Sequence, residues 1–132
     1  MPSVVMIDQE ESHLEFIREL FQNRFPEVKL FTVVDPNLAA AKAEIYGADL
    51  IITEIYFPQY QFDRGEELIQ SLRHARPEAK MMILSVHHDE NIVYKYRTIF
   101  GVDAYLKKIS CRMEDIVNKT FELLGRPHPF AS

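Results

Sequence analysis

Five short apolar runs alternate along this chain with longer segments in which apolar residues recur at helical spacing, and this alternation constrains the fold more than any other feature. The runs occupy residues 4–7, 28–33, 50–53, 81–84 and 104–106. Continuous apolar runs of this length are typical of strands that are buried on both faces of a sheet. Strands that alternate with helices through short connections form a parallel sheet with right-handed crossovers.

The intervening segments carry start and stop signals for helices. Asp35-Pro36 and Asp89 are placed to begin the second and fourth helices, and Ser12 with Glu15 forms a capping box for the first. We predict one α/β domain over residues 1–125 and a short tail over residues 126–132. Because two prolines interrupt the tail, we expect it to be mobile.

The predicted architecture is a flavodoxin-like (βα)5 sandwich of three layers, with a parallel sheet in the order 2-1-3-4-5. Ligands of such folds bind beyond the carboxyl ends of the strands. The residues that directly follow the first, third, fourth and fifth strands are therefore the candidates for function.

Composition limits the class of protein. The chain has 132 residues and a net charge of −5, with 47% hydrophobic residues and a single cysteine, Cys111. No apolar run approaches the ~18 residues that cross a bilayer, and no signal peptide precedes the first strand. The acidic balance argues against direct nucleic-acid binding. A lone cysteine excludes an internal disulfide and fits the reducing cytoplasm, where we expect this protein.

Acids, a hydroxyl and a lysine converge on the candidate edge of the sheet. Their order along the chain, strand by strand, is Asp8, Gln9, Glu10, Glu54, Ser85 and Lys108. Clustered carboxylates repel one another, so they need a divalent cation or a lysine nearby. Oxygen ligands with one open face suit Mg²⁺, and a metal with a lysine can neutralise a phosphoryl group in transfer.

Four segments make the chain similar to a known family. Asp49–Pro58 resembles the segment D-L-I-I-x-D-I-x-M-P, and Gly101–Lys108 resembles G-A-x-x-Y-L-x-K. Val4–Asp8 and Leu84-Ser85 match the corresponding first- and fourth-strand segments. Together they resemble the receiver domain of two-component response regulators over residues 3–124.

The resemblance implies a role for each matched residue. Asp8 and Gln9 take the places of the acidic pair beside Glu10, and Glu54 takes the place of the phospho-accepting aspartate. The Tyr56 carbonyl would be a metal ligand, and Lys108 would pair with the acceptor. Two further residues would be switch residues, namely Ser85 and Tyr105.

Two departures fall on the reaction centre of the family. Glu54 carries one methylene more than aspartate, and misplacement by about 1 Å can cost about a hundredfold in a positioned reaction. Gln9 removes one negative charge from the metal site, which weakens Mg²⁺ binding. The stretch between Pro58 and Gly65 is also longer than is usual in the family, and the loop from Tyr56 to Phe62 is aromatic. This loop is placed to cover the pocket, to form a contact surface for a partner, or to pack on the domain.

Simpler explanations exist for the same residues. Asp8 and Glu10 can serve only the helix macrodipole, and Glu54 can be a structural partner of Lys108. Ser85 can cap the following helix, and Tyr105 can be an ordinary core residue. His87 and His88 are adjacent and point to different sides, so we expect solvated loop residues there.

We expect a degenerate receiver-like signalling domain that is not an enzyme and works through protein partners, such as a histidine kinase or an output protein. It requires no cofactor, and any Mg²⁺ at Asp8, Glu54 and Tyr56 would bind weakly. A homodimer through the fourth helix, fifth strand and fifth helix is the self-association that the resemblance implies. The alternatives are a working Mg²⁺-dependent phosphorylation switch and a flavodoxin-like nucleotide or flavin binder. The last lacks a glycine-rich loop after the first strand.

Overall fold

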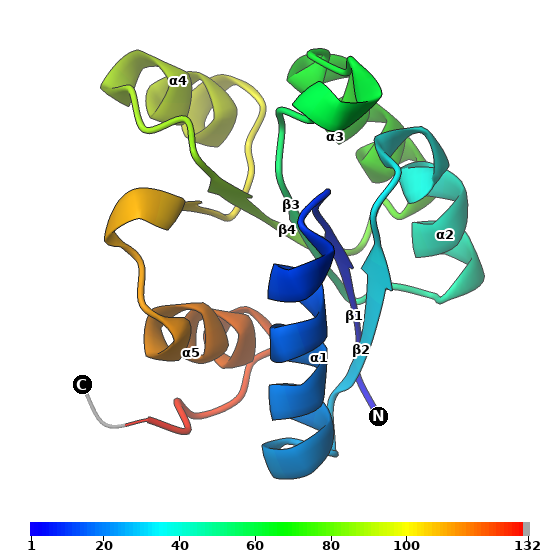
Figure 1. Cartoon of the computed structure of the whole chain (residues 1–132), viewed down its shortest axis with the longest axis vertical. Coiled ribbons are helices and arrows are strands. Elements are labelled where there is room, and N and C mark those ends of the chain that lie inside the picture. Colours follow the sequence, from blue (N-terminus) through cyan, green and yellow to red (C-terminus); the bar gives the residue numbers. More distant parts are fainter. Residues whose placement is uncertain (131–132) are drawn as a thin grey trace.

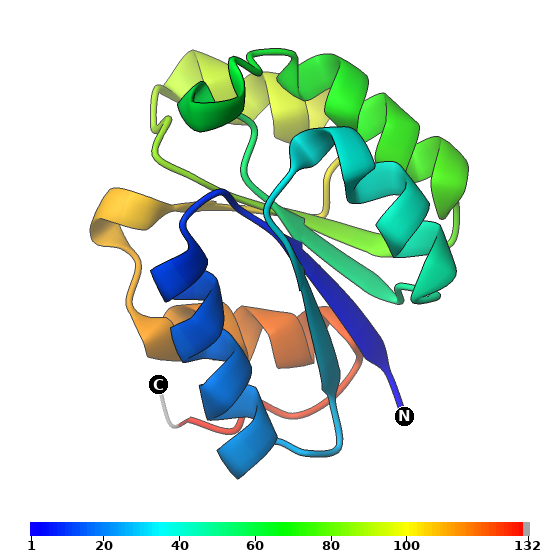
Figure 2. The same cartoon turned by 45° about the vertical axis from the view of Figure 1, so that its right-hand side comes forward.

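A five-stranded parallel sheet lies between two layers of helices in the computed structural model, which describes residues 1–130 (Figures 1 and 2). The strands are β1 (Ser3–Ile7), β2 (Lys29–Val33), β3 (Leu50–Thr53), β4 (Lys80–Ser85) and β5 (Ala104–Lys107). Their order is β2-β1-β3-β4-β5, and each pair is parallel. The predicted flavodoxin-like fold is confirmed, with β2 and β5 at the edges.

Helices cover both faces of the sheet. They are α1 (Glu11–Arg24), α2 (Ala39–Ile45), α3 (Gly65–Ala75), α4 (Glu90–Tyr94) and α5 (Met113–Leu123). α1 and α5 lie on one face, and α2, α3 and α4 lie on the other (Figures 1 and 2). Four short turns complete the chain, namely η1 (Pro36–Leu38), η2 (Pro58–Tyr60), the π-helical η3 (Lys95–Ile99) and η4 (Lys108–Ser110).

The strands supply alternate residues to two separate cores. Val5 and Ile7 of β1 pack under α2 and α3, whereas Val4 and Met6 pack under α1 and α5. Successive side chains of a strand point to opposite faces, so a strand with helices on both sides is apolar at every position. This is why the continuous apolar runs in the sequence predict the central strands correctly.

One of the predicted helix caps is wrong. The capping box of Ser12 and Glu15 is absent, because α1 already begins at Glu11 with Glu10 at its N-cap position and no side-chain cap. The predicted fourth helix is present, as α4 and the π-helical turn η3 that continues it to Ile99. Asp89, however, caps α4 as predicted and accepts a hydrogen bond from the Asn91 N–H at 2.7 Å.

Part of the predicted tail packs on the domain. Phe130 lies edge-on to Phe25, with ring centroids 5.9 Å apart, and the Arg24 guanidinium lies over the Phe130 ring. Asn118 of α5 exchanges two hydrogen bonds with the Phe130 backbone, at 3.0 and 3.2 Å. Phe130 therefore packs against α1 and α5, and residues 131 and 132 of the predicted tail lie outside the described residues.

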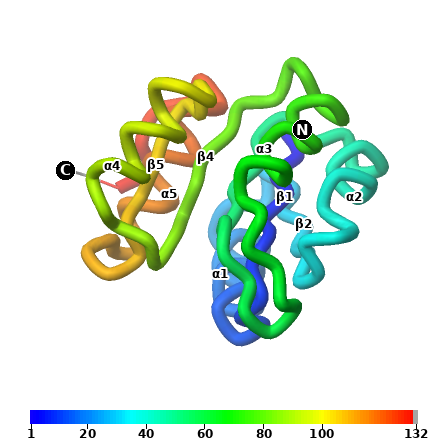
Figure 3. Tube along the Cα trace, turned by 90° about the horizontal axis from the view of Figure 1, so that it is seen from above, coloured from blue at the N-terminus to red at the C-terminus, as the bar shows by residue number. Residues whose placement is uncertain are grey.

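Seen from above, the edge strand β5 lies with α4 and α5 at one side of the molecule (Figure 3). Because all the strands are parallel, the carboxyl ends of β1, β3, β4 and β5 lie together at one end of the sheet. The functional residues are predicted at this end. None of the helices in residues 1–130 has both the length and the apolar character that a membrane crossing requires.

Candidate functional site

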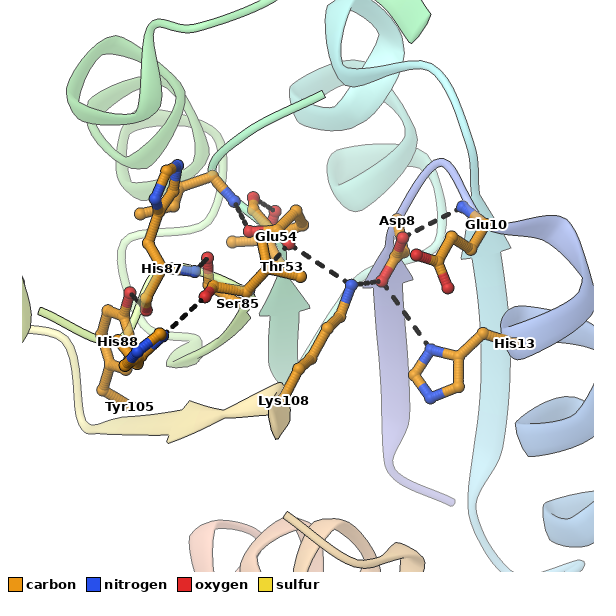
Figure 4. A network of polar contacts seen from close by, with 12 residues as sticks. Asp8, Glu10, His13, Thr53, Glu54, Ser85, His87, His88, Tyr105 and Lys108 are labelled. Carbon is orange, nitrogen blue, oxygen red and sulfur yellow. Dashed lines mark hydrogen bonds and ion pairs between the residues drawn. The ribbon is translucent and has the colours of Figure 1, made fainter. Parts of the chain in front are cut away.

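Lys108 joins two buried carboxylates at the carboxyl edge of the sheet. Its ammonium group lies 2.6 Å from Asp8 Oδ2 and 3.3 Å from Glu54 Oε1. The Asp8 and Glu54 side chains are only 2% and 3% exposed, and that of Lys108 is 15% exposed. Figure 4 shows the lysine side chain reaching between the two acids from the end of β5. The structure thus brings these three residues, which the sequence places at strand ends, into contact.

Asp8 is held as a carboxylate by its surroundings. Burial acts to raise the pKa of Asp8, but the neighbouring His13 imidazole and the Lys108 ammonium outweigh burial, so this pKa lies below its ordinary value. Burial likewise acts to lower the pKa of Lys108, but the hydrogen bond and charge of Asp8 outweigh it and raise this pKa. Both groups are therefore charged at neutral pH, as a buried ion pair requires.

Glu54 directly follows β3, and its carboxylate accepts hydrogen bonds from three donors. Its Oε1 accepts from the Val86 N–H at 3.2 Å as well as from Lys108, and its Oε2 accepts from the Ile55 N–H at 2.7 Å. The Glu54 N–H itself donates to the Ile7 carbonyl, which continues the β1–β3 pairing by one residue. The carboxylate thus lies between the ends of β3, β4 and β5.

Gln9 turns away from this cluster. Its Oε1 accepts a hydrogen bond at 3.0 Å from the N–H of Gln59, fifty residues further along the chain. The Glu10 side chain is exposed. The backbone N–H of Glu10 donates a hydrogen bond to Asp8 Oδ1 at 3.0 Å. Of the acidic segment after β1, only Asp8 therefore contributes a carboxylate to the contacts with Lys108.

The aromatic loop after β3 is anchored on the domain. Phe57 and Phe62 are buried, form a reciprocal backbone bridge, and lie 5.8 Å apart in an edge-to-face arrangement. Tyr56 is half-buried, with its ring 5.1 Å from that of His87, and Tyr60 is 37% exposed. The two phenylalanines fix the loop, so its other residues present a defined surface beside the pocket.

Ser85 and Tyr105 lie on the neighbouring strands β4 and β5. Ser85 is fully buried, and its Oγ accepts from the His87 N–H at 3.1 Å. It does not cap α4, where Asp89 has that position. The Tyr105 hydroxyl donates to the His87 carbonyl at 2.6 Å, with the ring packed in the core. Both residues thus hold the segment after β4, whose Val86 N–H reaches Glu54.

One member of the cluster escaped the sequence analysis. His13, on the first turn of α1, has its Nδ1 3.8 Å from Asp8 Oδ2, and within residues 1–130 this buried nitrogen has no hydrogen-bond partner. The spacing of five residues after Asp8 was the only signal available, since a helix that starts directly after β1 returns its first turn toward the strand end. The sequence could not single out the Val86 and Ile55 amide groups as donors to Glu54, because every residue except proline carries a backbone N–H.

The oxygen atoms of the two buried acids fit a lysine better than a magnesium ion. All four carboxylate oxygens of Asp8 and Glu54 already accept from an N–H or from the Lys108 ammonium. Mg²⁺ requires near-octahedral oxygen ligation with open water positions. Within residues 1–130, no group of three or more His, Cys, Asp or Glu side chains is arranged to hold a metal.

Comparisons with known proteins find the same architecture. No protein-family model matches the sequence, and no curated protein matches it significantly. Solved structures do match. A two-component response regulator from Clostridium difficile superimposes with a TM-score of 0.79 at 17% identity, over 96% of this chain and 98% of its own.

Two further structures are similar. A response regulator receiver protein from Burkholderia phymatum has a TM-score of 0.74 at 22% identity, over 98% of this chain and 100% of its own. The response regulator TrrA from Thermotoga maritima, solved in complex with Mg²⁺ and BeF, has a TM-score of 0.69 at 22% identity, over 93% and 99% of the two chains. The chain therefore has the fold of the response regulator receiver domains.

Proposed function

We propose that this protein is a receiver-like module of two-component signalling that acts through protein partners and does not depend on phosphorylation. The observation that carries the proposal is the hydrogen bonding of Glu54. Its two carboxylate oxygens accept from Lys108, Val86 and Ile55, so a permanent negative charge occupies the place where, by the sequence resemblance, an aspartate would receive a phosphoryl group.

The environment of Glu54 supports this assignment. A carboxylate carries less charge and fewer acceptor oxygens than a phosphoryl group, but here it already engages the lysine and the amide group after β4. The Tyr105 hydroxyl is bonded to the same β4–α4 segment. In this proposal Glu54 holds that segment in one conformation, and signalling follows from binding to a kinase or an output protein.

The acids of the site support independence from Mg²⁺. Gln9 stands at the second acidic position and its side chain is bonded to Gln59. The Lys108 ammonium contacts both Asp8 and Glu54 and offsets one of their two negative charges. In the proposed function no cofactor is needed and the domain catalyses no turnover of its own. The second candidate is a working phosphorylation switch, which is favoured by the TrrA complex with Mg²⁺ and BeF and by the retained Asp8 and Lys108.

Phosphorylation itself distinguishes the two candidates. We would incubate the protein with Mg²⁺ and acetyl phosphate, or with Mg²⁺ and beryllofluoride, and follow intact mass and the amide NMR signals of residues 54, 85 and 108. The proposal expects no adduct and no shift. The matched control is the Gln9→Asp, Glu54→Asp double variant, which restores both acids and should gain a phosphoryl mass. A phosphoryl gain in the unmodified chain that Glu54→Gln abolishes would overturn the proposal.

A further inference from the structure

The outer edge of strand β2 takes no part in the site described above, and it lies on the side of the molecule opposite β5 (Figure 3). The Lys29 N–H donates to the Pro2 carbonyl, and the Val33 carbonyl accepts from the Asp8 N–H. The backbone groups of the odd-numbered residues of β2 therefore point to β1. Because this direction alternates along a strand, the even-numbered residues point outward. They are Leu30, Thr32 and Val34.

The middle of this edge lacks the features that usually protect an outer strand. Natural sheets protect such strands with charges, prolines or bulges. The segment from Leu30 to Val34 contains neither a charged residue nor a proline. Within residues 1–130, no other strand and no loop is hydrogen-bonded to its outward backbone groups. An edge of this kind can accept a further strand.

Apolar side chains line the same edge on both faces of the sheet. On the α1 face, Phe21 and Leu30 contribute to the wall of a groove of about 400 Å³. On the other face, the half-buried rings of Phe31 and Tyr46 are stacked with their centroids 4.1 Å apart. Ile45, next to Tyr46, is 71% exposed. Contiguous apolar surface beside an unpaired strand is typical of a protein interface.

The order of residues along β2 fits a second copy of the same strand. A two-fold axis at Thr32 relates two antiparallel copies so that Leu30 of each lies opposite Val34 of the other. The outward backbone groups of both copies then face one another, as an antiparallel ladder requires. The same register places Lys29 of each copy opposite Asp35 of the other.

Charge selects this register among those that align the outward groups. Lys29 and Asp35 have no ion-pair partner among residues 1–130. The Asp35 backbone is extended, with φ −93° and ψ 113°, so the strand direction continues to it. A shift by two residues would place Asp35 opposite Glu27 or Phe31 instead. Opposite charges directly across antiparallel strands stabilise the pairing, and like charges weaken it.

The α1 side of the junction carries charges of both signs. Arg18 donates to the Thr32 hydroxyl at 3.0 Å, so pairing brings two arginines toward the axis. Glu11 and Glu15 lie with Arg18 around a cavity of about 250 Å³ beside Thr32. These acids offset the repulsion between the two arginines.

We propose that two copies of this chain associate through their β2 edges, antiparallel and with the two-fold axis at Thr32, so that the two sheets become one continuous sheet. The occupant is a second copy because this strand supplies both members of each charge pair. The inference goes beyond the proposed function and does not depend on it, since the hydrogen bonds of Glu54 and Lys108 do not involve β2.

The first test needs only the unmodified full chain. Sedimentation should show a monomer–dimer equilibrium, and amide hydrogen exchange is compared between dilute and concentrated samples. We expect exchange at Leu30, Thr32 and Val34 to slow at least tenfold in the dimer, while the N–H groups of Phe31 and Val33, which face β1, keep their rates. A chain that stays monomeric at millimolar concentration, or a dimer protected at β5 instead of β2, would overturn the proposal.

The second test uses Lys29→Glu and Asp35→Lys. Each variant alone places like charges opposite one another twice in the dimer and should weaken self-association about tenfold. An equimolar mixture restores both opposite-charge pairs in a heterodimer and should associate as well as the unmodified chain. Lys80→Glu, at an exposed lysine that begins β4, is the matched control and should leave association unchanged. A mixture that associates no better than either variant alone, or an equal loss in Lys80→Glu, would contradict this register.

Discussion

At the scale of single residues, the last lysine of β5 and the lysine that follows it have different roles. Lys108 lies between two buried carboxylates, whereas its neighbour Lys107 pairs with Glu90, whose side chain is 80% exposed. Removing one partner of a buried ion pair leaves an uncompensated charge, while exposed pairs contribute little. Adjacent positions in the sequence therefore offer a matched comparison.

Lys108→Ala should lower the free energy of unfolding by about 3 kcal/mol, because Asp8 and Glu54 would remain buried without a cation. Lys107→Ala should lower it by less than about 1 kcal/mol. Urea unfolding followed by circular dichroism measures both. Equal effects of the two substitutions would contradict the ion-pair description of the site.

Asp8 makes stability depend on pH in a defined direction. Its folded pKa lies below the ordinary value, so its contribution is fully present above the unfolded pKa of about 3.9 and is lost as pH falls through the folded pKa. The unmodified chain should therefore lose more unfolding free energy between about pH 6 and pH 3 than Asp8→Asn does. Urea titrations at several pH values give the dependence of the unfolding free energy on pH for each protein. Equal dependences in the two proteins would argue against the coupling of Asp8 to Lys108.

At the scale of elements, α3 and the α4–η3 segment meet at Gly65. A Cβ atom there would lie 2.4 Å from the Tyr96 hydroxyl and 2.9 Å from the Ile55 Cβ. Helix propensity alone makes alanine better than glycine by roughly 0.5–1 kcal/mol. The close contacts at position 65 predict instead that alanine lowers the stability of the protein. Gly65→Ala therefore tests whether packing or helix propensity has the larger effect.

Gly65→Ala should destabilise the protein by about 1–3 kcal/mol, as overpacking does. Adding Tyr96→Phe should recover part of the loss, because it removes the closest atom and leaves the Ile55 contact. Ser71→Ala, at an exposed position of the same helix, should change stability by less than about 0.5 kcal/mol. Thermal unfolding of the unmodified chain, Gly65→Ala, Tyr96→Phe and their double variant completes the cycle. A stabilised Gly65→Ala would show that the α4–η3 segment yields to α3.

At the scale of the whole molecule, Phe130 packs against the core between α1 and α5. Phe130→Ala should lower the free energy of unfolding by about 1–2 kcal/mol, because it removes a packed aromatic pair with Phe25. Phe16, which is 57% exposed on α1, is the matched control, and Phe16→Ala should cost less than about 0.5 kcal/mol. Denaturant titration measures both, and an unaffected Phe130→Ala would mean that the tail is dispensable for stability.

The sequence by itself determined the fold and the edge of the sheet at which the charged residues gather. Strands that are apolar at every position must be covered on both faces, and parallel strands bring their carboxyl ends to one edge. These two facts predict a parallel sheet covered on both faces, with the charged residues gathered at the carboxyl ends of its strands. The order 2-1-3-4-5 is the usual one for such a pattern, and the pairing of Lys108 with Glu54 is what the resemblance to receiver domains implies.

Only the tertiary structure decided where the polar side chains of that edge point. Gln9 bonds to Gln59, His13 approaches Asp8, and Asn118 holds Phe130. Each of these contacts joins segments through side-chain or backbone geometry that leaves no periodic pattern in the sequence. A polar group takes whichever partner the packed elements bring within hydrogen-bonding distance, and that choice is made after the apolar residues have fixed the fold.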